Sequence, residues 1–158
     1  MPPVRDVDDY SPLLTTSYHH DIIVGWGDCD PAQIAYTARI PAWGLEAVEG
    51  WYKACIGINW FDLNLDHGLG TPFVSLNFQF KSPIRGSGKL DIQVFVAKLG
   101  NSSIRHVVEG YQDGSFCFTG DTTAAFVDAS KMKPISVPAN IRDRIENYQS
   151  IQNREFAS

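Results

Sequence analysis

The chain has no long hydrophobic run, and this lack excludes a membrane-spanning protein. No apolar stretch among its 158 residues approaches the roughly 20 residues that cross a bilayer. The first residues are acidic and contain prolines, and they lack the basic region and apolar core of a secretory signal. We therefore expect a soluble protein of the cytoplasm.

Cysteine is also scarce, which excludes a disulfide framework and a zinc site. The three cysteines, Cys29, Cys55 and Cys117, are odd in number and widely spaced. The four histidines lack metal-ligand spacing as well. No metal site is expected, and the cysteines are predicted to be reduced thiols.

Positive charge is in deficit and scattered along the chain. The formal net charge is −5, whereas a nucleic-acid-binding protein needs a clustered basic face. A nucleic-acid partner is therefore excluded, although a small basic site for one phosphorylated ligand is compatible with this charge.

The chain contains enough apolar sequence for one domain. Hydrophobic residues make up 44% of the composition, and neither an internal repeat nor a low-complexity tract appears. We divide the chain into a loose lead-in (residues 1–14), a single domain (15–150) and a C-terminal tail (151–158).

Hydrophobic periodicity predicts one long buried helix and an antiparallel sheet. Apolar residues recur at helical spacing over residues 38–56, where small residues would let a sheet approach closely. The predicted strands are residues 15–26, 72–81, 89–97, 104–111 and 115–127, with a loop at 59–70 and a short helix at 138–149. The sequence thus predicts an α+β fold, with one curved sheet around a central helix.

An acidic turn precedes the predicted helix and carries the most chemical information. The run Gly27–Ala32 reads GDCDPA and places Asp28 and Asp30 two residues apart, directly before a proline. A helix start leaves backbone N–H groups without partners and favours an ionised carboxylate beside it. Such groups can hold and attack a carbonyl, although an aspartate in this position also commonly caps a turn. For Asp28 we expect the turn-stabilising role.

This run, together with Gly70–Ser75 (GTPFVS) before the second strand, resembles the hotdog-fold acyl-CoA thioesterases of the 4-hydroxybenzoyl-CoA thioesterase family. The resemblance extends over residues 17–130. It implies a hotdog fold and hydrolysis of an acyl-CoA thioester, with an aryl or short acyl group and no metal or redox cofactor. Coenzyme A would be part of the substrate.

The resemblance also implies residue roles. Asp30 corresponds to the catalytic carboxylate, as nucleophile or general base. The amide of Thr37 corresponds to the oxyanion donor. Candidate substrate-binding residues are Tyr36, Trp43, Glu46, His67, Thr71 and Ser75, and Lys98 and Arg105 are the nearest candidates for the phosphates of coenzyme A.

Several alternatives remain open at this stage. Gln33 stands where the family usually has glycine, so the path of the turn could differ. Aromatic residues at helical spacing, such as Trp43, are more often core than pocket. Thr71 could simply begin a strand, and Ser75 is expected on the same side of that strand as Thr71 and Phe73.

Two other functions are also compatible with the sequence: a non-catalytic acyl-CoA-binding module, and an acyl-CoA hydratase or dehydratase on the same fold. The second would require a histidine beside Asp30. The open edge of a sheet wrapped around one helix predicts at least a homodimer. The resemblance makes a homotetramer plausible and implies an active site between subunits.

Overall fold

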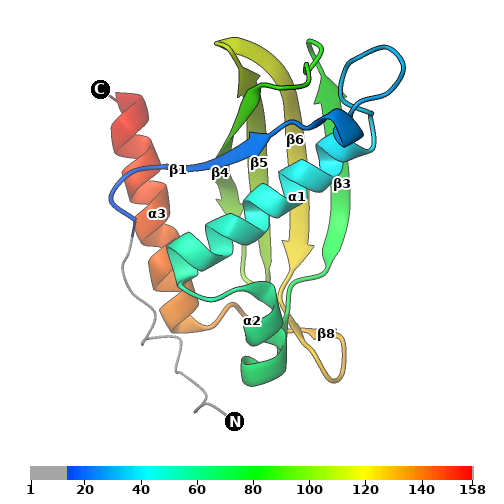
Figure 1. Cartoon of the computed structure of the whole chain (residues 1–158). Coiled ribbons are helices and arrows are strands. Elements are labelled where there is room, and N and C mark those ends of the chain that lie inside the picture. The colour runs from blue at the N-terminus through cyan, green and yellow to red at the C-terminus, as the bar shows by residue number, and fades with distance from the viewer. Residues whose placement is uncertain (1–13, 158) are drawn as a thin grey trace.

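The computed structural model describes residues 14–157, and it confirms the α+β architecture. The elements are β1 (Tyr18–Ile23), η2 (Trp26–Asp28), α1 (Arg39–Trp51), η3 (Tyr52–Ile56), α2 (Trp60–His67), β2 (Leu69–Gly70), β3 (Phe73–Phe80), β4 (Lys89–Leu99), β5 (Ser103–Gln112), β6 (Ser115–Ala125), β7 (Val127–Asp128), β8 (Lys133–Pro134) and α3 (Ala139–Ala157). Helix α1 crosses one face of a five-stranded sheet (Figure 1). Except for its last position, the predicted lead-in lies outside the described residues.

The sheet is antiparallel with the order β1-β4-β5-β6-β3, so the first and second long strands of the chain form its two edges. Strands β4 and β5 alternate buried and partly exposed residues along most of their length, as predicted. Asp113 and Gly114 connect β5 to β6 with φ angles of 51° and 78°. Two positive φ values are typical of the tight hairpin turn that this dipeptide predicts.

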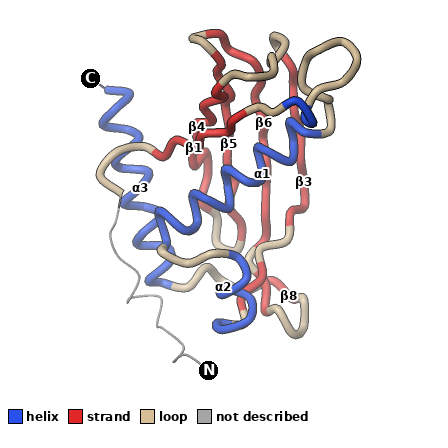
Figure 2. The backbone as a smooth tube through the Cα atoms, viewed as in Figure 1, coloured by secondary structure: helices blue, strands red, loops and turns tan. Residues whose placement is uncertain are grey.

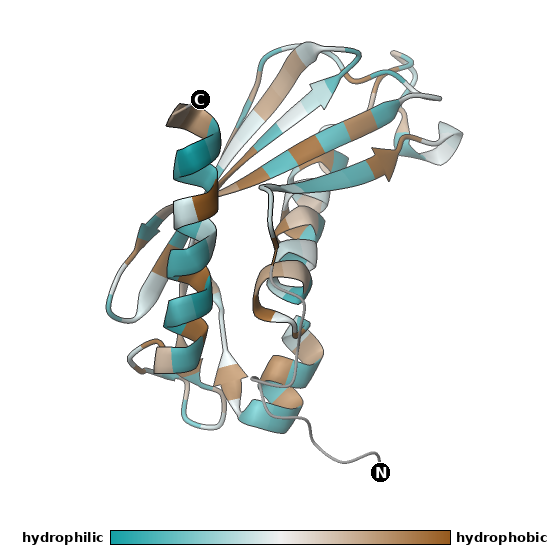
Figure 3. Cartoon of the chain, turned by 90° about the vertical axis from the view of Figure 1, so that its left-hand side faces the viewer, coloured by the Kyte–Doolittle hydropathy of each residue, from teal (hydrophilic) through white to brown (hydrophobic). Residues whose placement is uncertain are grey.

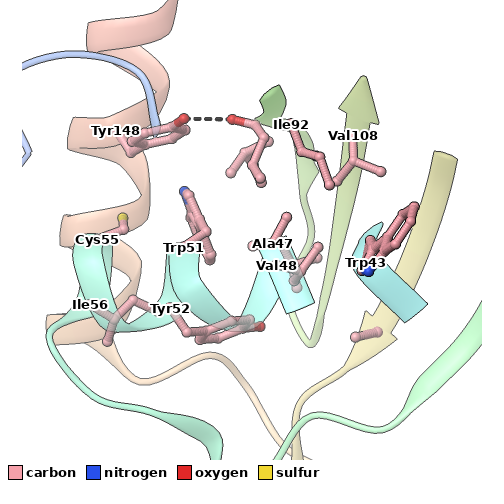
Figure 4. Packing of buried hydrophobic residues seen from close by; sticks show 14 of the residues in the cluster. Trp43, Ala47, Val48, Trp51, Tyr52, Cys55, Ile56, Ile92, Val108 and Tyr148 are labelled. Carbon is pink, nitrogen blue, oxygen red and sulfur yellow. Dashed lines mark hydrogen bonds between the residues drawn. The ribbon is translucent and has the colours of Figure 1, made fainter. Parts of the chain in front are cut away.

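Helix α1 packs closely on the sheet because it has glycine at the contact. A Cβ atom on Gly44 would lie 2.6 Å from the Phe78 ring of β3. Trp51 and Tyr52 are buried at the C-terminal end of the helix, where Trp51 packs edge-on against His106 of β5 and against Tyr148 of α3; Figure 4 shows Trp51 beside Tyr148. Pro41 lies in the first turn, where its missing N–H is tolerated. The predicted central helix is confirmed, and its last five residues form the π-helical turn η3.

The predicted loop at residues 59–70 is wrong, because it contains helix α2. The Asn59 side chain caps this helix by accepting a hydrogen bond from the Asp62 amide (2.9 Å), and Gly68 ends it in the left-handed conformation. A small sheet of order β2-β7-β8, which the sequence analysis did not predict, packs next to α2.

Helix α3 is longer than predicted and includes residues 151–157 of the predicted tail. Ile151 and Gln152 are buried, because they continue the apolar face begun by Ile145 and Tyr148. Figure 3 shows α3 as a largely hydrophilic helix with hydrophobic bands, beside the sheet. None of the helices within residues 14–157 combines the length and hydrophobicity needed to cross a membrane.

Helix α3 also closes one edge of the sheet. Strand β1 pairs with β4 only as far as Val94, and beyond it the Gln152 side chain bonds to both the N–H and the C=O of Val96 (3.0 and 2.8 Å). The Tyr148 hydroxyl donates to the Val94 carbonyl and accepts from the Tyr18 amide. Side chains of α3 thus satisfy backbone groups that an exposed edge would leave unpaired.

The opposite edge, β3, stays open. Three of its apolar side chains are largely exposed, with relative exposures of 66% for Val74, 48% for Leu76 and 49% for Phe80. No strand among residues 14–157 pairs with its outer side. An exposed apolar edge strand favours pairing with another chain.

Candidate active site

Asp30 lies in the loop between η2 and α1, at the same end of the sheet as the β3–β4 loop (Figure 2). Its backbone N–H donates to the Ile34 carbonyl (3.0 Å), and its carbonyl accepts from the Gln33 amide (2.8 Å). One side-chain oxygen, Oδ1, accepts from the Ala32 amide at 2.9 Å. The turn-capping role of Asp30 is thus present, and within the described residues Oδ2 has no hydrogen-bond partner. The half-buried Asp30 therefore presents one free carboxylate oxygen.

Asp28 ties the loop to both neighbouring elements, as predicted. Its Oδ2 accepts from the Gly25 amide (2.9 Å), and its Oδ1 lies 3.4 Å from Nε of Arg39, the first residue of α1. Its backbone carbonyl accepts from the Tyr36 amide (2.8 Å). These contacts fix the loop that carries Asp30 relative to the start of α1.

Thr37 is exposed directly before this helix start. The amides of Arg39 and Ile40 donate to the carbonyls of Tyr36 and Thr37 (2.9 and 3.2 Å). The Thr37 amide precedes these turn-closing bonds, so it has no carbonyl within the turn to bond. A free amide at the positive end of a helix suits a developing oxyanion.

Gln33 adopts a left-handed backbone conformation, with a φ of 68°. Glycine takes this conformation without steric cost, whereas other residues pay for it. Gln33 therefore follows a backbone path that glycine would favour.

A cavity of about 660 Å³ opens beside Asp30. One wall consists of residues between Trp26 and Gln33, and the other of Arg85, Gly86 and Ser87. The residues of the second wall were not among the sequence-predicted site residues. A backbone bridge between Ile34 and Arg85 holds the two loops together. The only local signal for this wall is the pair of glycines that brackets Ser87, which itself has a φ of 64°.

His67 and Thr71 lie at the other end of α1, around α2 and β2. Helix α1 spans residues 39–51, which corresponds to a length of about 20 Å. Nε2 of His67 is buried and has no hydrogen-bond partner in the described part of the chain. Burial raises the pKa of Tyr52, and the Thr71 side chain beside it partly offsets this effect. Within one chain, these two residues are thus not brought together with Asp30.

Tyr36, Trp43 and Glu46 have different environments along α1. Tyr36 is 55% exposed beside Thr37, whereas Trp43 is 7% exposed and packs in the hydrophobic core. Glu46 faces β1, where its Oε1 lies 3.0 Å from Nε2 of His20. Only Tyr36 of the three lies close to the turn that carries Asp30.

The prediction that Ser75 shares a face with Phe73 is wrong. A bulge between these residues shifts the register, so that Phe73 lies opposite the buried Ala124 and Ser75 opposite the partly exposed Thr123. The extra residue of a bulge reverses the side on which the following side chains point. Ser75 therefore points away from α1.

Lys98 and Arg105 lie opposite each other where β4 ends and β5 begins. That end of β4 is remote from Lys89, which pairs with the end of β1 that leads to the acidic turn. The Arg105 guanidinium is engaged by both carboxylate oxygens of Asp121, which raises the pKa of Arg105 and lowers that of Asp121. Among residues 14–157, no three side chains of His, Cys, Asp or Glu come together as a metal site would require.

Comparison with known proteins decides the family. The family model described as Thioesterase-like superfamily matches residues 24–145. The chain belongs to this superfamily. It is therefore a thioester hydrolase with a hotdog fold, as the resemblance implied. The search of curated protein sequences found no match.

Solved structures of several thioesterases are similar over most of the chain. A thioesterase superfamily protein from Jannaschia sp. CCS1 is 40% identical, with a TM-score of 0.80 over 87% of this chain and 96% of that one. A 1,4-dihydroxy-2-naphthoyl-CoA thioesterase from Synechocystis is 15% identical, with a TM-score of 0.76 over 83% and 96%. A DHNA-CoA thioesterase from Staphylococcus aureus is 19% identical, with a TM-score of 0.76 over 87% and 93%.

Proposed function

We propose that the protein hydrolyses acyl-CoA thioesters, with Asp30 as the nucleophile or general base. The observation that carries this proposal is that Asp30 lines a cavity next to a helix start and keeps one carboxylate oxygen, Oδ2, without a hydrogen-bond partner among the described residues. Asp30 would attack the thioester carbon to form a mixed anhydride, or remove a proton from the attacking water. The Thr37 amide would stabilise the oxyanion, a contribution of about 10²- to 10³-fold in rate.

The second half of the site would come from a partner subunit. Thr71 and His67 lie at the end of α1 away from Asp30, and β3 runs between these two ends along the open edge of the sheet. In a two-fold dimer with antiparallel β3 strands, the start of one β3 lies near the end of the other. Thr71 of one subunit then approaches Asp30 of the other. We propose such a homodimer, with a homotetramer as a further assembly, in the cytoplasm.

The proposed acyl group is aryl or short. Trp60 packs edge-on against Phe73 (ring centroids 5.8 Å apart) close to Thr71, so an aromatic surface lies beside the partner's half of the site. Two of the similar structures are, by name, thioesterases of aryl-CoA compounds. Tyr36 beside the oxyanion donor would contact the same group.

The alternative function of an acyl-CoA hydratase or dehydratase has less support. Such chemistry requires a histidine beside the carboxylate, and no histidine lines the cavity at Asp30 among the described residues. His19 and His20 contact Asp91 and Glu46, respectively, and His106 is buried in the core.

The test is an Asp30→Asn variant assayed for free thiol release from a panel of aryl, branched and straight-chain CoA thioesters. We expect a loss of about 10²- to 10⁴-fold in kcat, with unchanged folding by circular dichroism. Asp143→Asn on α3 is the matched control and should keep full activity. Turnover that survives Asp30→Asn refutes the assignment. Tight acyl-CoA binding by the wild type without hydrolysis would instead support a non-catalytic binding module.

A further inference from the structure

Trp26 is almost wholly exposed at the mouth of the cavity beside Asp30. Its relative exposure is 93%, whereas Trp43 and Trp51 are buried in the core. Exposure alone assigns no role to a side chain, but Trp26 also lines the cavity, where an exposed indole ring can stack on the ring of a ligand. Its backbone is nevertheless fixed, since the amide of Cys29 donates to the Trp26 carbonyl (3.2 Å) within η2. The backbone position from which the ring projects is therefore defined.

Arg85 forms the facing wall, and a buried side chain holds its backbone. The Gln112 amide group accepts from the Arg85 N–H and donates to the Arg85 carbonyl, both at 2.8 Å. Gln112 is only 4% exposed, and Gly88 leaves room for it, since a Cβ there would lie 2.5 Å from its Nε2. Because the buried Gln112 side chain bonds to both backbone groups of Arg85, it fixes the loop that forms this wall of the cavity.

The guanidinium of Arg85 remains available for a ligand. Within residues 14–157 its one ion pair is with Asp113 at 3.7 Å, and both side chains are more than 70% exposed. Such a pair contributes little in water. A phosphate or carboxylate that enters the cavity can bind the guanidinium in two-pronged geometry and displace Asp113.

We propose that this cavity binds a flat conjugated ring that carries negative charge, with Trp26 stacked on the ring and Arg85 paired with the anionic group. The proposal rests on the proposed function, because an acyl-CoA substrate supplies this chemistry in two places. One is the adenine ring and phosphates of coenzyme A, which can fold back beside the thioester. The other is an acyl group whose aromatic ring bears an ionised substituent.

Binding can be tested without turnover, by acrylamide quenching of tryptophan fluorescence in the full-length protein. Because Trp26 is the most exposed tryptophan, it should dominate the quenching, and a Trp26→Phe variant verifies this. Adenosine 3′,5′-bisphosphate probes the nucleotide source, and terephthalate probes the aryl source. Protection of Trp26 by either probe, at concentrations where adenosine and acetate do not protect, is the expected result and identifies the source.

Variants then assign the contacts. Calorimetry measures the affinity of each variant for the probe that protects Trp26. We expect Arg85→Gln and Trp26→Ala each to weaken this binding about tenfold. Lys98→Gln, Arg105→Gln and the surface control Arg154→Gln should leave it unchanged. If neither probe protects Trp26, or if Lys98→Gln or Arg105→Gln weakens binding instead of Arg85→Gln, the proposal is overturned. A change of oligomeric state in Trp26→Ala would also overturn it, since Trp26 would then belong to a subunit contact.

The two proposals fail in different ways. Probe binding that depends on Trp26 and Arg85, together with full turnover by Asp30→Asn, supports the cavity and refutes the catalytic assignment. Loss of turnover in Asp30→Asn, with probe binding indifferent to Trp26 and Arg85, refutes the cavity alone.

Discussion

The two ends of helix α1 differ in how their polar groups are satisfied. At the N-terminal end, Asp28, Asp30 and Gln112 bond to backbone groups of the surrounding loops. At the C-terminal end, Trp51, Tyr52, Trp60, His106 and Thr122 form a polar-aromatic cluster, and four of them, Trp51, Trp60, His106 and Thr122, have buried nitrogen or oxygen atoms with no hydrogen-bond partner among the described residues. The loops at the N-terminal end of α1 are thus held in place by hydrogen bonds within the chain. The C-terminal end retains unused hydrogen-bonding capacity, next to the Thr71 half of the proposed site.

The largest effect is expected from a substitution that separates the two subunits of the proposed dimer, and with them the Asp30 and Thr71 halves of the proposed site. Leu76→Asp places a charge on the open β3 edge, so pairing of two β3 strands would bury it. We expect a folded monomer by light scattering and a loss of at least about 100-fold in kcat/KM, since a misplaced group costs that much. Ile23→Asp, at a 73% exposed residue of β1, is the control that should remain dimeric and active. A dimeric Leu76→Asp variant would contradict the arrangement.

A second prediction concerns the stability of the polar-aromatic cluster at low pH. Burial lowers the pKa of His106 to about 3, against an ordinary value of about 6.5 in the unfolded chain. Between these pH values the unfolded state binds more protons, so acidification from pH 6.5 should reduce the free energy of unfolding by up to about 1.4 kcal/mol per pH unit. Urea denaturation at pH 7.5, 6.5 and 5.5 measures this slope.

The matched variants assign this slope to one residue. His106→Leu should flatten it above pH 5, where the carboxylates whose pKa values are lowered, such as Asp121, stay ionised. Thr119→Val, at a partly exposed position of β6 that carries no titratable group, should retain the wild-type slope. An unchanged slope in His106→Leu would mean that another group takes up the proton.

At the N-terminal end, Gln112→Ala should destabilise the fold. The substitution leaves the N–H and C=O of Arg85 without their buried partner, and we expect a loss of about 2 kcal/mol in the free energy of unfolding. Thermal and urea unfolding measure it. Gln79→Ala, on the exposed part of β3, deletes an amide group that is exposed to solvent, so it should lower the free energy of unfolding only slightly. Equal stabilities of the two variants would show that Gln112 does not hold the cavity wall.

The same contrast explains what the sequence could predict. The strands, α1 and the acidic turn follow from local periodicity and from turn residues such as Asp113 and Gly114. Arg85 could not be found in this way, because only the long-range bridge to Ile34 brings it to Asp30. The orientation of Ser75 depends on a bulge that leaves no sign in the alternation. Helix α2 was missed because its exposed apolar residues, Phe61 and Leu65, obscure the helical pattern.

A smaller effect is expected from Thr122→Val in the polar-aromatic cluster. The Thr122 hydroxyl is buried, has no hydrogen-bond partner between residues 14 and 157, and lies opposite Leu76 and His106 in the sheet. Replacement by a side chain of the same shape removes an unsatisfied group, so the free energy of unfolding should rise by about 1 kcal/mol. Thr119→Val, on the partly exposed face of β6, should change it less. Destabilisation by Thr122→Val would mean that its hydroxyl has a bound partner.

The smallest predicted effect tests whether the N-terminal end is strained. Gln33 has a φ of 68°, a conformation that costs a residue with a Cβ about 1–2 kcal/mol. Gln33→Gly should remove this cost and lose part of the gain to the greater freedom of glycine in the unfolded chain, for a net stabilisation of about 0.5 kcal/mol. Gln33→Ala keeps the Cβ and should show no gain. Because Gln33 lines the cavity beside Asp30, thiol release should also be measured for both variants. If thiol release falls in both variants while stability rises only in Gln33→Gly, the side chain contacts the substrate and the backbone strain is a separate effect.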